Sequence, residues 1–122
     1  MTKTIDITAI QRQLLEFARE RDWEQFHTPK NLAMALAGEA GELVALWQWI
    51  GAHMGHDYVN ATAKTPAELA DILIYAFRLA DVLGIDLSSA IGAKIAENAK
   101  KYPADLARGT AKKYTELDHD SP

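Results

Sequence analysis

Apolar residues recur at helical spacing along most of the chain. Ile10, Leu14 and Phe17, for example, are four and three residues apart and therefore share one helix face. The longest break, residues 51–64, has no clear period, and no stretch shows strand alternation. The fold class is therefore predicted to be all-α. The predicted helices cover residues 7–22, 28–50, 65–83 and 87–101.

Capping signals set the predicted helix boundaries. Thr28-Pro29 and Thr65-Pro66 each combine an N-cap side chain with a proline at the first helical position. Gly84 suits the residue just after a helix, and Asp86 can cap the helix that follows. Pro103 ends that last helix.

Length and composition predict one soluble domain over residues 1–122, with a core at about 7–103 and a polar tail at 104–122. The hydrophobic content is 48% and the net charge is −4, so no polymeric nucleic acid partner is expected. The sequence contains no cysteine. Since it shows neither a signal peptide nor a long apolar run, we expect no membrane partner and a cytoplasmic location.

The helix predicted at 28–50 carries a carboxylate on its packing face. Glu39 falls in the centre of the apolar stripe, and Glu42 lies one turn further on the same side. Gly38 and Gly41 leave room beside them for another backbone or a ligand. The alternative is that Glu39 lies at a partly exposed helix edge and the glycines serve packing alone. The stripe comprises Leu32, Leu36, Glu39, Leu43, Leu46 and Ile50.

The helix predicted at 65–83 is apolar almost all round, with one narrow polar stripe. That stripe contains Glu68, Asp71, Tyr75 and Arg78. Glu68 has a purely structural alternative, since Thr65 and Glu68 have the spacing of a capping box. A solvated strip would also account for the whole pattern.

Four carboxylates from two helices repel one another unless cations bind between them. Oxygen ligands favour Mg²⁺ or Mn²⁺ over zinc or copper. A di-iron site is disfavoured because neither acidic pair has a histidine at the required offset. The predicted metal ligands are Glu39, Glu42, Glu68 and Asp71.

The two acidic pairs resemble the signature of the MazG-like all-α NTP pyrophosphatases, and most closely their dCTP pyrophosphatase branch. The similarity covers about residues 14–117. It includes residues 17–27, residues 38–43, Trp49, residues 71–75, Asn98, Tyr102-Pro103 and residues 113–117. It implies a four-helix-bundle protomer that forms a homodimer or a dimer of dimers, with sites near subunit interfaces.

The resemblance also implies the chemistry. Nucleoside triphosphate, with dCTP or a modified dCTP favoured, would be hydrolysed to monophosphate and pyrophosphate in nucleotide-pool house-cleaning. Carboxylate-held Mg²⁺ would bind the triphosphate, and a water deprotonated by a carboxylate would attack the α-phosphorus. Glu39 and Glu42 are the expected catalytic residues. The sequence does not decide which carboxylate is the general base, and Glu42 is taken as the candidate.

The family's nucleobase pocket corresponds to Trp23, His27, Trp49 and Tyr75, whose alternative role is core or interface packing. Trp47 is expected to be structural. Leu14 replaces a histidine of the animal dCTP enzymes, and the loop at 51–64 also differs, which weakens the case for strict cytosine preference. Further substrate contacts are expected at Lys94, Asn98, Tyr102, Lys112 and Lys113.

Other functions remain open at this stage. A phosphoribosyl-ATP pyrophosphohydrolase would share the fold and the bond cleaved. A helical dimer that binds nucleotide or a protein partner without catalysis is the non-enzymatic alternative. His53 and His56, three residues apart in the loop, are a weak second candidate for metal binding.

Overall fold

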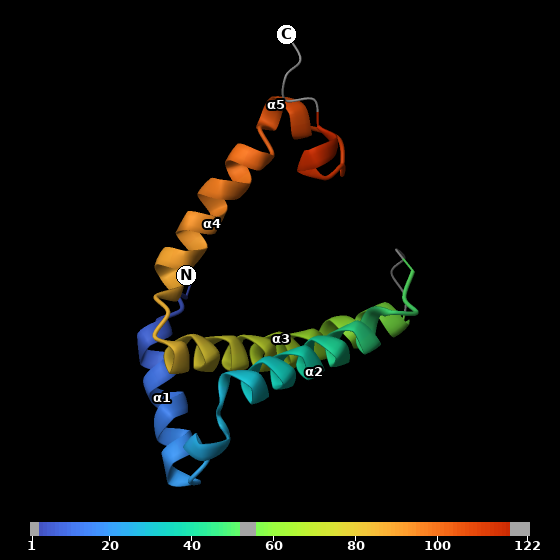
Figure 1. The fold of residues 1–122 in the computed structure, drawn as a ribbon. Coiled ribbons are helices and arrows are strands. Elements are labelled where there is room, and N and C mark those ends of the chain that lie inside the picture. The colour runs from blue at the N-terminus through green and yellow to red at the C-terminus, as the bar shows by residue number, and fades with distance from the viewer. Residues whose placement is uncertain (1–2, 52–55, 118–122) are drawn as a thin grey trace. The chain divides into compact units, whose positions relative to one another are not determined.

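The computed structural model describes residues 3–51 and 56–117 and separates the chain into two compact units, Met1–Ile85 and Asp86–Pro122. The first holds α1 (Ile7–Glu20), the 3-10 helix η1 (Glu24–Phe26), α2 (Pro29–Trp47) and α3 (His56–Leu83), as shown in Figure 1. The second holds α4 (Leu87–Lys101), α5 (Ala104–Ala107) and η2 (Tyr114–Glu116). No strand occurs in the described residues, so the all-α fold class is confirmed. That the whole chain forms one domain stays a prediction.

Three residues cap or end helices as the sequence predicts. The Thr28 side chain accepts a hydrogen bond from the Asn31 amide at 3.2 Å, with Pro29 in the first turn of α2. Asp86 accepts from the amide three residues on and opens α4. Gly84 follows α3 with a φ of +67°, a conformation that costs glycine little.

The predicted start of α3 is wrong, because the helix begins at His56 and passes through Thr65 and Pro66. Thr65 is therefore no N-cap: its hydroxyl donates to the Ala61 carbonyl at 2.7 Å, within the helix. The capping box inferred for Thr65 and Glu68 does not form. Pro66 lacks an amide proton and lies inside the helix, a position that local preference disfavours.

Packing against the end of α2 accounts for the early start. The Trp47 indole N–H donates to the Thr65 hydroxyl at 2.9 Å, and its ring meets Tyr58 edge to face at 5.3 Å. These contacts hold the first turns of α3 against α2. Trp47 is structural, as expected, and α2 ends there rather than at Ile50.

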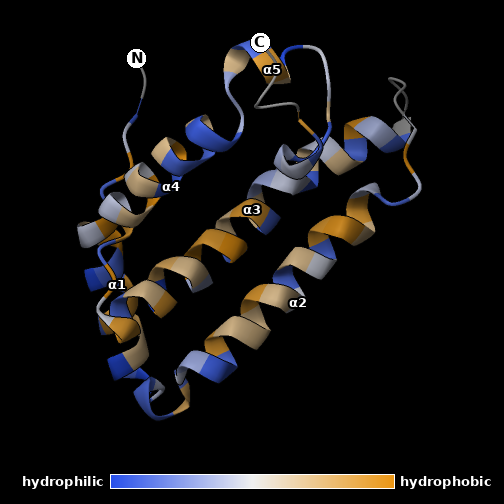
Figure 2. Cartoon of the chain, turned by 45° about the horizontal axis from the view of Figure 1, so that its top comes forward, coloured by the Kyte–Doolittle hydropathy of each residue, from blue (hydrophilic) through white to orange (hydrophobic). Residues whose placement is uncertain are grey.

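Within the first unit, α2 and α3 lie side by side along their length, and α1 packs on α3 (Figures 1 and 2). Few apolar side chains of the described residues are buried. Arg78 is also buried, at 6% exposure. None of the described helices combines the length and hydrophobicity needed to cross a bilayer. The buried apolar residues are Ala18, Leu32, Ala61, Phe77 and Ala80.

Candidate metal centre

Three carboxylates from two helices meet in the first unit. Glu39 and Glu42 come from successive turns of α2, and Glu68 comes from the middle of α3. One oxygen from each lies within 4.8 Å of the other two. The antiparallel packing of α2 on α3 brings these side chains together from distant parts of the sequence. Such a set of oxygens could hold a metal ion.

Two oxygens of this cluster lack any compensating contact. Oε2 of Glu39 and Oε2 of Glu68 are buried and have no hydrogen-bond partner among the described residues. A buried acceptor without a partner costs free energy, so each such atom needs an explanation. A cation between the carboxylates would supply the missing partner for both atoms.

The crowding also changes the proton affinity of the cluster. The hydrogen bond that Glu39 shares with Glu42, followed by burial and by the charges of its acidic neighbours, raises the pKa of Glu39 to about 7. Burial, followed by a hydrogen bond with Glu42, raises the pKa of Glu68. Both changes show that the group resists carrying its full negative charge without a cation.

Asp71 lies one turn after Glu68 on α3 and is half-buried. Its charge raises the pKa of both Glu39 and Glu68, so it acts on the same site. The structure thus brings together three of the four predicted ligands and places the fourth within their electrostatic reach. Because Thr65 does not form a capping box, the structural alternative for Glu68 is removed.

A second feature of the first unit is an aromatic cavity of about 340 Å³. Trp23 and His27, on either side of η1, line it together with Tyr75 of α3. The Trp23 and His27 rings stand edge to face at 6.4 Å. Three of the four residues expected in a nucleobase pocket therefore share one cavity. It is completed by Phe26, Asn31, Leu32 and Ala35.

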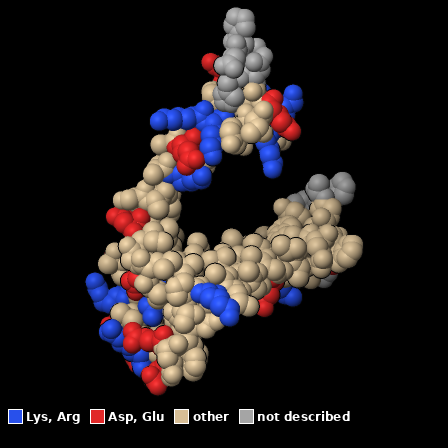
Figure 3. All heavy atoms as spheres, in the orientation of Figure 1, with Lys and Arg blue, Asp and Glu red and all other residues tan. Residues whose placement is uncertain are grey.

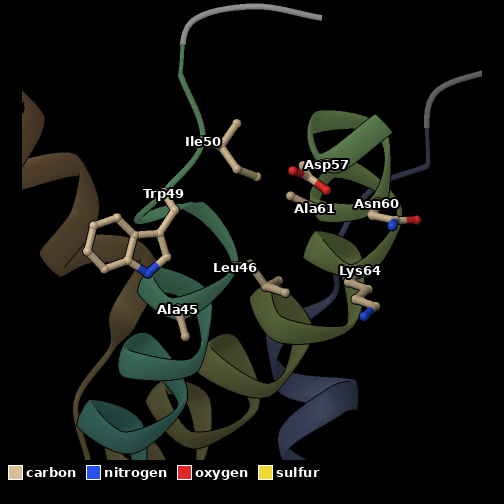
Figure 4. Close-up of a pocket in the computed structure, with 8 residues that line it drawn as sticks. All are labelled: Ala45, Leu46, Trp49, Ile50, Asp57, Asn60, Ala61 and Lys64. Carbon is tan, nitrogen blue, oxygen red and sulfur yellow. The ribbon is translucent and has the colours of Figure 1, made fainter. Parts of the chain in front are cut away.

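Trp49 lies elsewhere. It follows α2, is 88% exposed, and lines a different pocket near Asp57, Asn60 and Lys64 of α3 (Figure 4). Within one chain the structure does not bring Trp49 to the cavity of Trp23, His27 and Tyr75. His53 and the side chain of His56 lie outside the described residues.

The remaining predicted contacts belong to the second unit. Lys94 of α4 pairs with Glu97 at 3.3 Å, and Lys101 pairs with the same glutamate at 3.0 Å. Tyr102 ends α4 and meets Tyr114 edge to face. That this set contacts a substrate stays a prediction. The set comprises Lys94, Asn98, Tyr102, Lys112 and Lys113.

The sequence did not reveal a contact between Arg78 and His27. The Arg78 Nε atom donates to His27 Nδ1 at 3.0 Å. In the sequence, Arg78 stands out only as the last residue of the polar stripe of α3. That position does not indicate which residue Arg78 contacts. The histidine lies 51 residues away, on the linker between α1 and α2.

The chain belongs to the MazG-like family, whose sequence model matches residues 38–117. This range includes the whole carboxylate cluster but not Trp23 or His27.

Among individual proteins, the chain is similar to dCTP pyrophosphatase 1 from Homo sapiens and Bos taurus. The identities are 47% and 46% over 113 residues, which are 90% of this chain and 66% and 67% of the two relatives. The chain thus spans about two-thirds of their length. A pyrophosphatase from Archaeoglobus fulgidus has a similar fold, with a TM-score of 0.70 and 31% identity over 84% of this chain and 97% of that one.

Proposed function

We propose that the protein is a nucleoside triphosphate diphosphatase that hydrolyses (d)NTP, with dCTP or a modified dCTP as best substrate, to the monophosphate and pyrophosphate. The observation that carries this proposal is the meeting of three glutamates with two buried, unpartnered oxygens. The similarity to dCTP pyrophosphatase 1 over 90% of the chain supports the substrate class.

The residues fit a hard divalent ion. All donors are carboxylate oxygens, which suit Mg²⁺, with Mn²⁺ as a substitute. Glu39, Glu42 and Glu68 would hold it, together with Asp71. An ion bound there would supply positive charge against the phosphates and would favour ionisation of a nearby water at neutral pH.

Within the cluster, Glu42 is suited to accept a proton from the attacking water. It is the exposed member, whereas Glu39 and Glu68 are half-buried, so a proton taken by Glu42 can pass to solvent. Glu39 lies one turn before Glu42 on α2, and one oxygen of each is within 4.8 Å of the other. Attack at the α-phosphorus then releases pyrophosphate.

The aromatic cavity would hold the base. Trp23 and Tyr75 offer flat faces for stacking, and His27 offers a hydrogen bond. The triphosphate would contact Lys94 and Asn98, with Tyr102, Lys112 and Lys113 as further contacts.

We also propose a homodimer or dimer of dimers. Much of the apolar surface of α2 and α3 is uncovered, including Val44, Leu69 and Leu73. On the face shown in Figure 3, most of the surface over α2 and α3 is uncharged. Large apolar side chains that stay exposed over two adjacent helices are typical of an interface between subunits. We expect the substrate site to lie near a subunit interface of that assembly. A cytoplasmic location stays a prediction.

The test is to incubate the purified protein with Mg²⁺ and a panel of nucleotides, including dCTP, modified dCTP and phosphoribosyl-ATP, and to separate the products. We expect monophosphate and pyrophosphate, with none formed by Glu39→Gln or Asp71→Asn. Turnover of phosphoribosyl-ATP alone would reassign the substrate. Nucleotide binding without turnover and unaffected by a chelator would support a non-catalytic regulator.

A further inference from the structure

We propose that Arg78 is a positioning residue that fixes His27 as a neutral imidazole with its proton on Nε2. His27 then presents a hydrogen-bond donor to the aromatic cavity and selects ligands with an acceptor atom on the ring edge. The identity of that ligand as a nucleobase rests on the proposed function, whereas the state of His27 does not.

The contact between the two side chains is buried and directional. Arg78 on α3 is only 6% exposed, and its Nε atom lies 3.0 Å from Nδ1 of His27. Its other end is held by Asp81, with 3.4 Å between Nη1 and Oδ2. The guanidinium is thus fixed at both ends.

The chemistry of arginine then decides the state of His27. A guanidinium carries only donors and keeps its charge at every accessible pH. The partner atom Nδ1 must therefore offer its lone pair, which leaves the proton of the neutral ring on Nε2. A doubly protonated ring would turn an N–H toward the guanidinium and lose the hydrogen bond.

The surrounding charges act in the same direction. Burial, and then the positive charge of Arg78, lower the pKa of His27. Glu24 opposes them, and it is itself paired with Arg19 at 3.1 Å. Since the pKa of His27 lies below its ordinary value of 6.5, the ring is neutral at pH 7.

His27 lines two neighbouring cavities. One contains Arg78, and the other contains Asn31 and Tyr75 but not Arg78. The two ring nitrogens of an imidazole point in widely different directions, so Nε2 is directed away from Arg78. Nε2 has no hydrogen-bond partner within residues 3–51 and 56–117. A ligand in the aromatic cavity would supply that partner.

The ligand class follows from this donor. Nε2–H can only donate a hydrogen bond, so it pairs with a ring carbonyl or an unprotonated ring nitrogen, both of which a cytosine ring presents on one edge. A histidine with the opposite tautomer would instead require a donor from the ligand. Arg78 would therefore determine specificity without touching the base.

The direct test is a long-range ¹H–¹⁵N correlation spectrum of the nucleotide-free protein, with His27 assigned by the signal lost in His27→Phe. We expect the Nε2–H tautomer in the wild type at pH 7. In Arg78→Met we expect a mixture of tautomers and a higher His27 pKa, and in Arg78→Lys a smaller change. Arg12→Met, on the exposed face of α1, is the matched control and should leave the spectrum unchanged.

Kinetics test the link to specificity. Loss of one neutral hydrogen bond predicts a KM about tenfold higher in Arg78→Met, with kcat within about twofold. In a His27→Phe background, Arg78→Met should change KM little, because its effect passes through His27. Circular dichroism and thermal melts identify a variant that fails to fold, in which case Arg78→Lys is used.

Either of two results would overturn the inference: an Nδ1–H tautomer in the wild type, or the same rise in KM for Arg78→Met with and without His27. A protein that turns over no nucleotide but shows the Nε2–H tautomer would refute the proposed function alone.

Discussion

Glu39 and Glu68 lie on different helices, have oxygens within 4.8 Å of each other, and each keep a buried Oε2 atom without a hydrogen-bond partner among the described residues. The hydrogen bond with Glu42, burial and the charges of the neighbouring carboxylates raise the pKa of Glu39 to about 7, so Glu39 keeps its proton at pH values at which a free glutamate would lose it. The first unit therefore tolerates an unfavourable arrangement that a cation would relieve. This relationship makes the site testable by stability as well as by activity.

Replacing Glu39 by glutamine should weaken Mg²⁺ binding at least tenfold and abolish pyrophosphate release, because one ligand charge is lost. The same change should raise the melting temperature of the metal-free protein, since it removes like-charge repulsion. Glu16→Gln, on the exposed face of α1, is the control and should alter neither property. Calorimetric titration with Mg²⁺ and thermal melts in chelator measure both. A destabilised metal-free Glu39→Gln protein would contradict the prediction.

The stability of the metal-free protein should depend on pH through Glu39. Its pKa is about 7 in the folded chain against an ordinary 4.5, so between these values the folded state binds more protons than the unfolded one. The contribution of Glu39 to stability is therefore present at low pH and declines as pH rises through this window. Mg²⁺ binds the deprotonated group, so its affinity should rise over the same range.

His27 acts in the opposite direction, because its lowered pKa makes stability rise with pH below 6.5. The measurement is therefore the difference between wild type and Glu39→Gln in chelator, from pH 4.5 to 8. We expect the wild type to lose stability relative to the variant across that range. A constant difference would mean that Glu39 titrates normally.

Gly38→Ala and Gly41→Ala should stabilise the protein while lowering its activity. A Cβ added at either position meets nothing within 4 Å, and alanine gains about 0.5–1 kcal/mol over glycine inside a helix. If nucleotide or a second copy of the chain uses the space, turnover falls. Gly92→Ala, equally open on α4, should gain stability alone. Urea unfolding and product release separate the two effects, and full activity in both α2 variants would show that the space is not used.

Thr65→Val should destabilise the protein by about 1–2 kcal/mol, because the Trp47 indole N–H loses its acceptor in a part-buried position. Thr62→Val is the matched control, since the exposed Thr62 hydroxyl donates to the Tyr58 carbonyl within the same helix and has no other hydrogen-bond partner among the described residues. It should change the free energy of unfolding by less than about 0.5 kcal/mol. Equal effects in urea titrations would argue that Thr65 acts only within α3.

Features that depend on neighbouring residues were predictable from the sequence. The bounds of α4, the cap at Asp86 and the turn at Gly84 follow from local side-chain hydrogen bonds and backbone preference. The helical period likewise placed Glu39 and Glu42 on one face of α2, because side chains three apart in a helix are always neighbours.

Features that depend on contacts between distant residues were decided by the tertiary structure. Local preference favours a helix that starts at Thr65-Pro66, but Tyr58 packs on Trp47 and the free energy of that contact extends α3 back to His56. The approach of Glu68 to Glu39 and the bond from Arg78 to His27 likewise arise only when α3 packs against the rest of the first unit. Periodicity determines which face of a helix a residue occupies, whereas only packing determines what lies opposite that face.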